Sequence, residues 1–462
     1  MTVDYRIQPY AEVGAGWFPD SLHIFTYDVR GTVLRTGQLK RCRQTGLVTH
    51  THQLLGGFAR AYPNLRLAIT QTGAQEGASD LVRTPEGQTV LVYGIQTGFP
   101  DLLRVGGMKC PHRVQHFYES AIDDPDNPVY RSLAGQYATA IRRAGTPHLI
   151  AQNINPLVSI LKADEFGLLG DFAPVHVIGV VHDTVDMPRR LDYVRRRLAQ
   201  GTATITLIAV SQAVPRYLLD EAGIASENVR TVCNGIEAHT FCRRVEQARQ
   251  DGVFERVRAR NGLPTEGRML FTSARRVTWK GHHDVLHAIT LLAAHGCGDF
   301  YVVFNGASLV DTRDQGYEKH LAQTVAELGL RRTVFLLGEL TDAELTDAEL
   351  AACYGQAHIA VHPSRLPEPF GYANIEAMLA GVPVITTAHG APLEYITHGI
   401  SGLLVPLGDP PALATAIDAL LSDQQLHARL AVAGRASASR FGLDAMVRGY
   451  QAAIRAHLTV TP

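Results

Sequence analysis

The chain has 462 residues, which is too long for one ordinary hydrophobic core and predicts two or three domains. Hydrophobic residues make up 46% of it and charged residues 19%, a balance typical of globular enzymes. The net charge of −1 excludes a global field that would draw the protein onto nucleic acid or a lipid surface. No nucleic-acid partner is therefore expected.

The amino-terminal residues 1–14 contain no basic stretch followed by an apolar one, so they are not expected to be a signal peptide. No apolar run is long enough to predict a membrane-spanning helix. The six cysteines are scattered without a Cys-x-x-Cys pair, which predicts reduced thiols and argues against a zinc site. These features together predict a cytoplasmic protein.

Short runs that are apolar on both faces alternate with helix-like stretches along most of the chain. This alternation predicts an α/β protein with doubly wound parallel sheets, whose strands are covered by helices on both sides. The predicted strands of the first half are 22–27, 65–70, 89–94, 148–153 and 175–182, and those of the second half are 268–273, 300–306, 333–338, 358–363, 382–387 and 402–407.

The two series of strands predict two Rossmann-like domains. The charged segment 242–264 interrupts the strand rhythm and is the expected break between them. The repeated sequence TDAELTDAEL at 341–350 has the Thr-x-x-Glu spacing of a capping box in each copy, so a helix start is expected there. A functional acidic patch is the alternative interpretation of this repeat.

The sequence EPFGYANIEAMLAGVPVI, which begins at Glu368, has the features of a ligand site. Pro369 disfavours helix at Glu368, and Gly371 permits close approach by a ligand. A helix is predicted to begin near Ala373 with Glu376 in its first turn, where free N–H groups suit phosphate oxygens. The two carboxylates could accept hydrogen bonds from two polyols, the pattern of a nucleotide sugar. The alternative is an acid pair that only stabilises the helix dipole.

This segment, extended to PSRLPEPFGYANIEAMLAGVPVITTAHGAPLEYI, resembles the E-x7-E signature of retaining GT-B glycosyltransferases of the family-4 type. TSARRVTWKGHHDVLHAI resembles the Gly-Arg-x4-Lys-Gly segment of that family, with Arg275 and Lys280 at the matching positions. An Asn-Gly pair, Asn234 and Gly235, also matches, and so does the tail SGLLVPLGDPPALATAI. The resemblance is strong over about 205–425 and weaker upstream.

The resemblance implies a GT-B architecture, in which two Rossmann-like domains face each other across a cleft. Residues 1–245 would form an acceptor-binding domain and residues 246–440 a nucleotide-sugar-binding domain. Residues 441–462 are helical by pattern, and the resemblance implies that this helix crosses back onto the first domain.

The resemblance also implies roles for residues at the matching positions. Arg275 and Lys280 would clamp the donor diphosphate, and both are expected to be catalytic. Glu376 would bind the ribose hydroxyls, and Glu368 would contact a hydroxyl of the donor sugar at the reaction centre. An exposed basic turn is the alternative for the two cations. Further donor contacts are expected from Phe370, Gly371 and Tyr372.

His182 ends a predicted strand at the position where the family places a histidine at the cleft. It would hydrogen-bond the donor sugar as a catalytic residue, although a lone histidine can also be a satisfied core residue. Asp183 follows it and is a candidate acceptor contact. His389 replaces a glycine that is usual in the Gly-Gly-x3-Glu element of the family, which here retains Gly390 and Glu394. The sequence therefore does not predict the donor sugar.

The glycine-rich loop near the amino terminus matches the family least well. Gly46 is the candidate donor-diphosphate glycine because a helical pattern begins right after it, and Gly37 is the second choice. Lys40, Arg41 and Arg43 in the same loop could meet phosphate or be solvated.

The resemblance implies front-face departure and attack with retention, without an enzyme nucleophile. Arg275, Lys280 and the helix start would stabilise the departing nucleoside diphosphate electrostatically. No metal and no cofactor is expected beyond the substrate nucleotide sugar, which would be UDP- or GDP-linked. No general base is assigned, because the departing phosphate oxygen could take the acceptor proton.

The sequence predicts the acceptor less precisely than the donor. The acidic stretch 116–130, with Asp183 and Asp186, would favour a cationic or polyhydroxylated acceptor, such as an aminocyclitol in natural-product (antibiotic) biosynthesis; a solvated loop is the alternative. The arginine-rich composition is typical of an actinobacterial genome. The basic helix pattern at 189–198 could instead touch anionic lipid, as in a membrane-surface glycosyltransferase for a glycolipid or cell-wall precursor. A nucleotide-sugar-binding protein without turnover is a third hypothesis, and the oligomeric state is not predicted.

Overall fold

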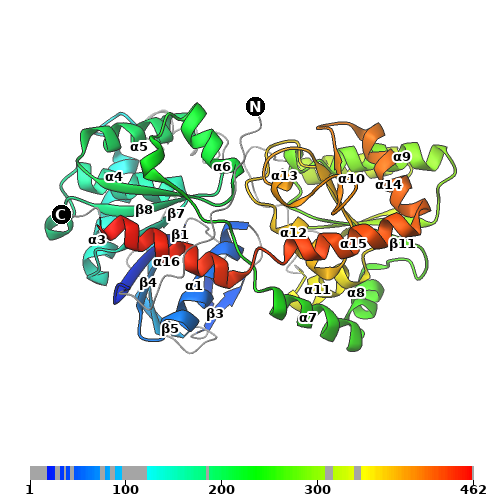
Figure 1. The fold of residues 1–462 in the computed structure, drawn as a ribbon, viewed down its shortest axis with the longest axis horizontal. Helices are drawn as coiled ribbons and strands as arrows, with labels where there is room; N and C mark the ends of the chain where they lie inside the picture. Colours follow the sequence, from blue (N-terminus) through cyan, green and yellow to red (C-terminus); the bar gives the residue numbers. More distant parts are fainter. Residues whose placement is uncertain are drawn as a thin grey trace.

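The protein is described here by a computed structural model. Its two units lie side by side, and each consists of a sheet flanked by helices (Figure 1). Among the described residues, no helix combines the length and the apolar character that a membrane span requires. The described residues are 18–26, 32–35, 38–41, 46–72, 79–83, 89–95, 122–183, 187–306, 316–337 and 345–459.

The sheet of the first unit has the strand order β10-β9-β8-β7-β1-β4-β6-β5-β3-β2. Strands β10 to β6 of this order pair in parallel, whereas β5 and β2 pair antiparallel with their partners β6 and β3. Its strands are β1 (Ser21–Thr26), β2 (Thr32–Arg35), β3 (Gln38–Arg41), β4 (Arg66–Thr72), β5 (Ser79–Arg83), β6 (Thr89–Ile95), β7 (Leu149–Gln152), β8 (His176–Val181), β9 (Thr204–Ala209) and β10 (Val229–Thr231). Its main helices are α1 (Gly46–Ala61), α3 (Pro128–Ala144), α4 (Ile154–Glu165), α5 (Pro188–Gln200) and the short α6 (Ala213–Arg216).

The sheet of the second unit is entirely parallel, with the order β13-β12-β11-β14-β15-β16. Its strands are β11 (Arg268–Ser273), β12 (Phe300–Asn305), β13 (Val334–Leu337), β14 (Ile359–His362), β15 (Val384–Thr387) and β16 (Leu403–Val405). Its helices are α7 (Ala238–Gln250), α8 (Val253–Asn261), α9 (His282–Ala294), α10 (Tyr317–Glu327), α11 (Asp347–Gln356), α12 (Tyr372–Ala380), α13 (Pro392–Tyr395), α14 (Pro410–Ser422) and α15 (Gln424–Ala438).

All eleven strands that the sequence predicts are present, and the doubly wound α/β class is confirmed. The capping box in the second copy of the repeat is also confirmed, because Thr346 and Glu349 cap α11 reciprocally. Five strands of the first sheet were not predicted, namely β2, β3, β5, β9 and β10. The charged segment 242–264 forms most of α7 and all of α8, which pack against α11 on the second sheet. The domain limits given above stay a prediction.

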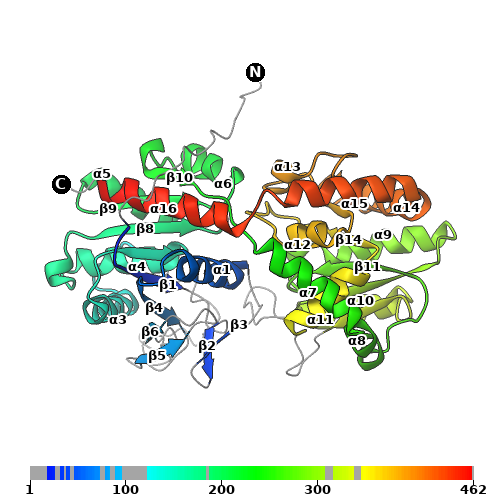
Figure 2. The ribbon, with the colours of Figure 1, turned by 60° about the horizontal axis from the view of Figure 1, so that its bottom comes forward.

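The last helix, α16 (Leu443–Thr459), leaves the second unit and packs against α1 and β9 of the first. Figures 1 and 2 show it in red, lying along the first unit in both views. The chain joining the units passes close to the start of this helix at Gly235. A Cβ atom there would lie 2.8 Å from the carbonyl oxygen of Gly442, so this position of the Asn-Gly pair has room only for glycine.

Three buried histidines make the stability of the folded protein sensitive to acid. Burial lowers the pKa of His23, His50 and His282 to about 3 in each case, and none of the three rings is exposed. An unfolded histidine takes up a proton at about pH 6.5. Between these two pH values the unfolded chain binds more protons, so the free energy of unfolding must fall as the pH falls.

At pH 5.5, each of these histidines is expected to lower the free energy of unfolding by about 1.4 kcal/mol relative to neutral pH. Urea unfolding at pH 7.5 and 5.5 measures the difference. The change His23→Gln should reduce the pH dependence, whereas His389→Gln, at an exposed position, should leave it unchanged. Equal stability of the wild type at both pH values would contradict this expectation.

Candidate functional site

The predicted site residues follow the carboxyl ends of parallel strands in both sheets, the edge where doubly wound sheets bind ligands. His182 follows β8, Arg275 follows β11, and Glu368 lies in the loop after β14. The charge of Asp183, in the first unit, raises the pKa of Lys280 in the second. The two carboxyl edges therefore meet at the junction between the units.

Glu394 connects the two units directly. Its carboxylate accepts hydrogen bonds from the backbone N–H groups of Gln212, at 2.9 Å, and Ala213, at 2.8 Å. Both donors lie at the start of α6 in the first unit, whereas Glu394 belongs to α13 of the second. Burial raises the pKa of Glu394, and these hydrogen bonds oppose that shift. This glutamate thus holds the junction together.

Lys280 and Glu368 form an ion pair at the candidate site. The Lys280 side chain is 16% exposed and that of Glu368 14%. Burial lowers the pKa of Lys280, while the neighbouring Glu368 raises it and Arg275 lowers it further. A lysine in this position is a strong partner for an added anion, because burial leaves its charge poorly solvated.

Trp279 lies beside both predicted diphosphate-binding cations, and the sequence analysis did not identify it. Its ring centre is 4.0 Å from Lys280 Nζ and 5.7 Å from the guanidinium carbon of Arg275. These distances suit cation–π contacts, which hold the two positive charges on one aromatic surface. The only available signal in the sequence was the position of this aromatic residue between the two matched basic residues.

The adjacent arginines Arg275 and Arg276 have different environments. Arg276 is completely buried, donates to the carbonyl of Leu337 at 2.7 Å and pairs with Glu318 at 2.5 Å. Arg275 is only half-buried and lies by Trp279. Arg276 is thus a structural residue of the second core, and Arg275 is the one that a ligand at the junction can reach.

The loop that carries Glu368 runs beside the element in which this chain departs from the family pattern. Glu368 forms a parallel β-bridge with Gly390, and its carbonyl accepts the N–H of Ala391 at 2.8 Å. A Cβ at position 390 would lie 2.6 Å from the Glu368 carbonyl oxygen, so glycine is required there. His389 itself is exposed.

Helix α12 begins at Tyr372, one residue before Ala373, so the predicted start is confirmed, but Glu376 lies in the second turn. The prediction of Glu376 in the first turn was therefore wrong. The physical reason is Gly371, whose φ of 83° ends the loop in the left-handed region and lets the helix begin at the next residue. The Glu376 side chain is 5% exposed.

The aromatic residues around the start of α12 have partners within the protein. The carbonyl of Phe370 accepts a hydrogen bond from Tyr395 Oη at 3.0 Å, and its ring is buried against Phe441. Tyr372 Oη donates to the carbonyl of Gly235 at 3.4 Å, in the link between the units. The donor contacts predicted for these two residues stay predictions.

His182 is half-buried and bonded to Gln152 at the end of β7, with 2.9 Å between His182 Nε2 and Gln152 Oε1. Burial lowers its pKa well below the ordinary value, and the adjacent His50 lowers it further. The ring is therefore neutral at physiological pH. Because a carbonyl oxygen only accepts, the proton lies on Nε2, and Nδ1 is left as an acceptor.

Asn153 lies beside the candidate site residue Asp183, and the sequence analysis did not identify it. It follows β7 with φ 111° and ψ 168°, a region that is sparsely populated by residues other than glycine and that often marks functional sites. Its side chain accepts from the N–H of Ile154 at 2.7 Å and lies 3.5 Å from Asp183. Asp183 itself is exposed at the junction.

The predicted glycine of the amino-terminal loop, Gly46, is the first residue of α1. Lys40 and Arg41 lie in strand β3. Gly37 and Arg43 lie outside the described residues. No contact among the described residues shows whether this loop binds a phosphate group, so that expectation stays a prediction.

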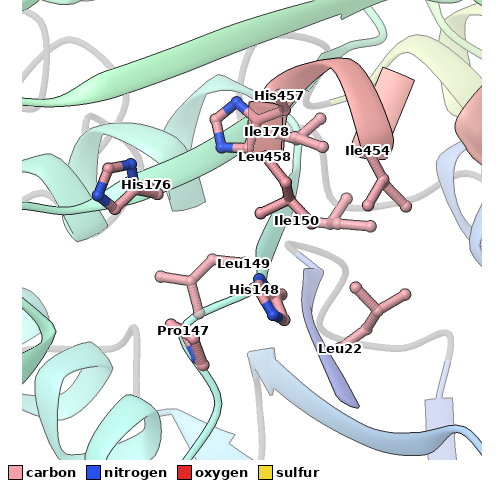
Figure 3. Close-up of a pocket in the computed structure, with 10 residues that line it drawn as sticks. All are labelled: Leu22, Pro147, His148, Leu149, Ile150, His176, Ile178, Ile454, His457 and Leu458. Atoms are coloured by element: carbon pink, nitrogen blue, oxygen red, sulfur yellow. The ribbon is translucent and has the colours of Figure 1, made fainter. Parts of the chain in front are cut away.

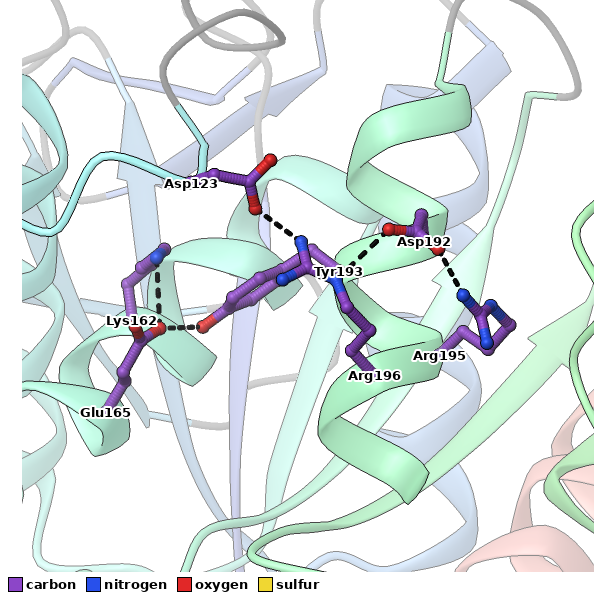
Figure 4. A network of polar contacts seen from close by, with 7 residues as sticks. All are labelled: Asp123, Lys162, Glu165, Asp192, Tyr193, Arg195 and Arg196. Atoms are coloured by element: carbon purple, nitrogen blue, oxygen red, sulfur yellow. Dashed lines mark hydrogen bonds and ion pairs between the residues drawn. The ribbon is translucent and has the colours of Figure 1, made fainter. Parts of the chain in front are cut away.

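The other charged stretches that the sequence analysis singled out form contacts within the first unit. Arg195 and Arg196 of α5 pair with Asp192, and Arg196 also pairs with Asp123 from the acidic stretch 116–130 (Figure 4). Arg197 pairs with Asp164 at 2.5 Å. The basic helix and the acidic stretch thus neutralise each other in part, while Glu119 and Asp186 lie outside the described residues.

A small apolar pocket lies at the opposite edge of the first sheet, where β1, β7 and β8 begin (Figure 3). The end of α16 covers it. It is therefore distant from the carboxyl edge that carries His182. Its lining residues are Leu22, Pro147, His148, Leu149, Ile150, His176, Ile178, Ile454, His457 and Leu458.

Within the ranges that the structure describes, no group of three or more His, Cys, Asp or Glu side chains could hold a metal ion. The expectation that the chemistry needs no metal stays a prediction.

Comparison with known proteins connects this geometry to a family. Residues 253–437 match the family described as glycosyl transferases group 1. The D-inositol 3-phosphate glycosyltransferase of Xylanimonas cellulosilytica is 28% identical over 242 residues, 52% of this chain and 54% of the relative. Mannosylfructose-phosphate synthase of Agrobacterium fabrum is 25% identical over 49% of this chain and 47% of its own. The chain thus spans about half the length of the curated relatives it matches.

Solved structures match along nearly the whole chain. HepE from Anabaena, in complex with UDP and glucose, superimposes with a TM-score of 0.64 and 20% identity, covering 94% of this chain and 99% of that one. Sucrose-phosphate synthase from Thermosynechococcus elongatus gives a TM-score of 0.69 and 19% identity, covering 95% and 100%. The fold is therefore GT-B, with two Rossmann-like domains, as the sequence resemblance implied.

Proposed function

We propose that this chain is a retaining glycosyltransferase that moves a sugar from a nucleoside-diphosphate sugar to a small polar acceptor. The observation that carries the proposal is the junction itself, where Lys280 of the second unit, beside Arg275, interacts with Asp183 of the first, the residue that follows His182. The match of residues 253–437 to the glycosyl transferases supports it, as do relatives named for sugar transfer. The HepE structure contains UDP and glucose, the ligand class proposed here.

The proposed chemistry depends on stabilising the charge of the leaving group. As the bond between the sugar and the diphosphate breaks, negative charge develops on a phosphate oxygen. Trp279 holds Arg275 and Lys280 on one aromatic surface, so little reorganisation is needed when that charge appears. The departing oxygen would take the acceptor proton, and no residue is assigned as general base.

In this proposal, the donor also separates the ion pair of Lys280 and Glu368. In the structure the charges of Lys280 and Glu368 neutralise each other. A diphosphate beside Lys280 would supply the counter-charge, and the Glu368 carboxylate would then be available to a hydroxyl of the donor sugar. Glu376, which is buried in the second turn of α12, would bind the ribose hydroxyls.

The acceptor proposed is neutral or cationic and rich in hydroxyl groups, such as an aminocyclitol in natural-product biosynthesis. Asp183 supports it, because it is an exposed carboxylate at the junction that would repel an anionic acceptor. The relative named D-inositol 3-phosphate glycosyltransferase acts, by its name, on a cyclitol that carries a phosphate. This chain would thus differ from it in acceptor charge.

The proposal predicts that one nucleoside diphosphate stabilises the protein and that Glu376→Ala removes the effect. Thermal unfolding is measured with UDP, GDP and ADP. A nucleotide at 100 times its dissociation constant should add about 2.7 kcal/mol to the stability. The control is Glu246→Ala, on the exposed face of α7, which should keep the full shift.

A shift with one nucleotide, lost only in Glu376→Ala, would locate the donor site and restrict the donor to one nucleotide class. The absence of any shift in the wild type would refute the transferase proposal. A shift that persists in Glu376→Ala would remove this residue from the donor site. Turnover of the matching nucleotide sugar then separates a transferase from a nucleotide-sugar-binding protein without activity.

The membrane-surface alternative receives no specific support from the structure. It depended on the basic helix at 189–198, and the arginines Arg195, Arg196 and Arg197 each pair with a carboxylate of this chain.

A further inference from the structure

His182 is surrounded by side chains from three elements that are far apart in the sequence. Gln152 of β7 bonds its Nε2 at 2.9 Å. His50 of α1 packs its ring against the His182 ring at 69°, with the ring centres 4.6 Å apart. Tyr450 of α16 lies behind His50, with 3.1 Å between Tyr450 Oη and His50 Nε2. A continuous line of contacts therefore runs from α16 to the predicted reaction centre.

The contact between α16 and α1 that carries this line is tight. Gly57 lies seven residues after His50 and thus on the same face of α1. A Cβ at Gly57 would lie 2.4 Å from a methyl group of Val447, which is three residues before Tyr450 on α16. The ring of Phe58 also packs edge-on to Tyr450, 6.2 Å between centres. Close packing of this kind leaves the Tyr450 hydroxyl little freedom of position.

The rings of His50 and Tyr450 are fully buried and therefore cannot contact a substrate. Their effect on His182 is to restrict its ring. Gln152 determines which nitrogen carries the proton, and the His50 ring limits rotation about the bond that joins the His182 ring to its side chain. Tyr450 in turn holds His50 by the hydrogen bond to Nε2.

We propose that His50 and Tyr450 are positioning residues, which hold the His182 ring with its Nδ1 available to the donor sugar and so make turnover depend on the docking of α16. The inference rests on the proposed function, since it concerns the same reaction centre. It goes further by assigning a role in turnover to a helix that joins the second unit to the first.

The test is Tyr450→Phe in the chain of 462 residues, a change that removes the hydroxyl and keeps the ring. Three quantities are measured: the ring nitrogen signals of His50 and His182 by ¹⁵N NMR, the thermal stabilisation by UDP, and the release of UDP from UDP-glucose. The same change is made in a His182→Ala background. Tyr193→Phe is the matched control, because it removes another buried tyrosine hydroxyl of the first unit, bonded to Glu165 at 2.5 Å.

We expect Tyr450→Phe to shift the ring nitrogen signals of both histidines and to lower kcat about tenfold, with little change in KM. In the His182→Ala background it should have no further effect on kcat, because its effect is exerted through His182. The control Tyr193→Phe should leave the histidine signals and kcat unchanged. His50→Phe should lower kcat in the same way as Tyr450→Phe.

Unchanged His182 signals in Tyr450→Phe would overturn the inference, and so would an equal loss of kcat in the presence and absence of His182. These outcomes are distinct from failure of the proposed function, which would appear as absence of nucleotide stabilisation in the wild type. The NMR measurement uses the ligand-free chain and therefore tests the positioning link in either case.

Discussion

Replacing Lys280 by methionine is expected to abolish nucleotide stabilisation and to lower turnover by about 10²–10³-fold. Methionine keeps much of the volume of the side chain and removes its charge. Losing one preorganised partner of a developing charge has a cost of this size in other enzymes. The measurements are nucleotide-dependent thermal shift and release of nucleoside diphosphate from its sugar. Lys319→Met, at an exposed position of α10, is the control and should behave as wild type.

The same substitution leaves Glu368, which is 14% exposed, without its cation. The ligand-free protein should therefore lose stability, because a mostly buried carboxylate is then unpaired. The double variant Lys280→Met with Glu368→Gln should regain that stability without regaining nucleotide binding. Should Lys280→Met keep the full nucleotide shift, the diphosphate would have to bind elsewhere.

The second large effect is expected for Gly281→Ala. Gly281 follows Lys280 with φ 73°, and a Cβ there would lie 2.0 Å from the carbonyl oxygen of Pro363, a backbone atom. No side-chain movement relieves such a contact, so the turn that carries Lys280 and the loop after β14 must separate. We expect the free energy of unfolding to fall by about 3 kcal/mol or more, together with loss of the nucleotide shift.

The control for this prediction is Gly262→Ala. Gly262 has nearly the same backbone conformation, φ 62°, but nothing lies within 4 Å of an added Cβ. It should lose only about 1 kcal/mol, the ordinary cost of a left-handed conformation at a residue with a side chain. Urea unfolding measures both variants. Equal losses would mean that conformation alone, and not the contact with Pro363, makes glycine necessary.

These two predictions concern the adjacent residues Lys280 and Gly281, and the position of the first depends on the second. Gly281 lets the turn at Thr278–Lys280 approach the end of β14, and that approach brings Lys280 within reach of Glu368. Trp279, between the two cations, then shares one surface with both. Charge placement at the junction is thus a consequence of backbone packing around one glycine.

The sequence alone was sufficient for the fold class, for a simple physical reason. Parallel strands covered on both sides must be apolar on both faces, so most of these strands are marked by their own residues. Local chemistry also placed two boundaries correctly, since Thr346 and Glu349 cap α11 and Pro369 keeps Glu368 out of α12. The predicted position of Glu376 within α12 was wrong by about one residue, which moves it from the first turn to the second, because the start of that helix depends on the conformation of Gly371.

Only the tertiary structure decided which residues are buried and which residues far apart in the sequence are in contact. Arg275 and Arg276 are the same residue type side by side, yet one lies at the junction and the other is buried against Glu318. His50 and Tyr450 are 400 residues apart and meet behind His182. No local pattern encodes such contacts, because they arise only when α16 packs across the junction onto α1.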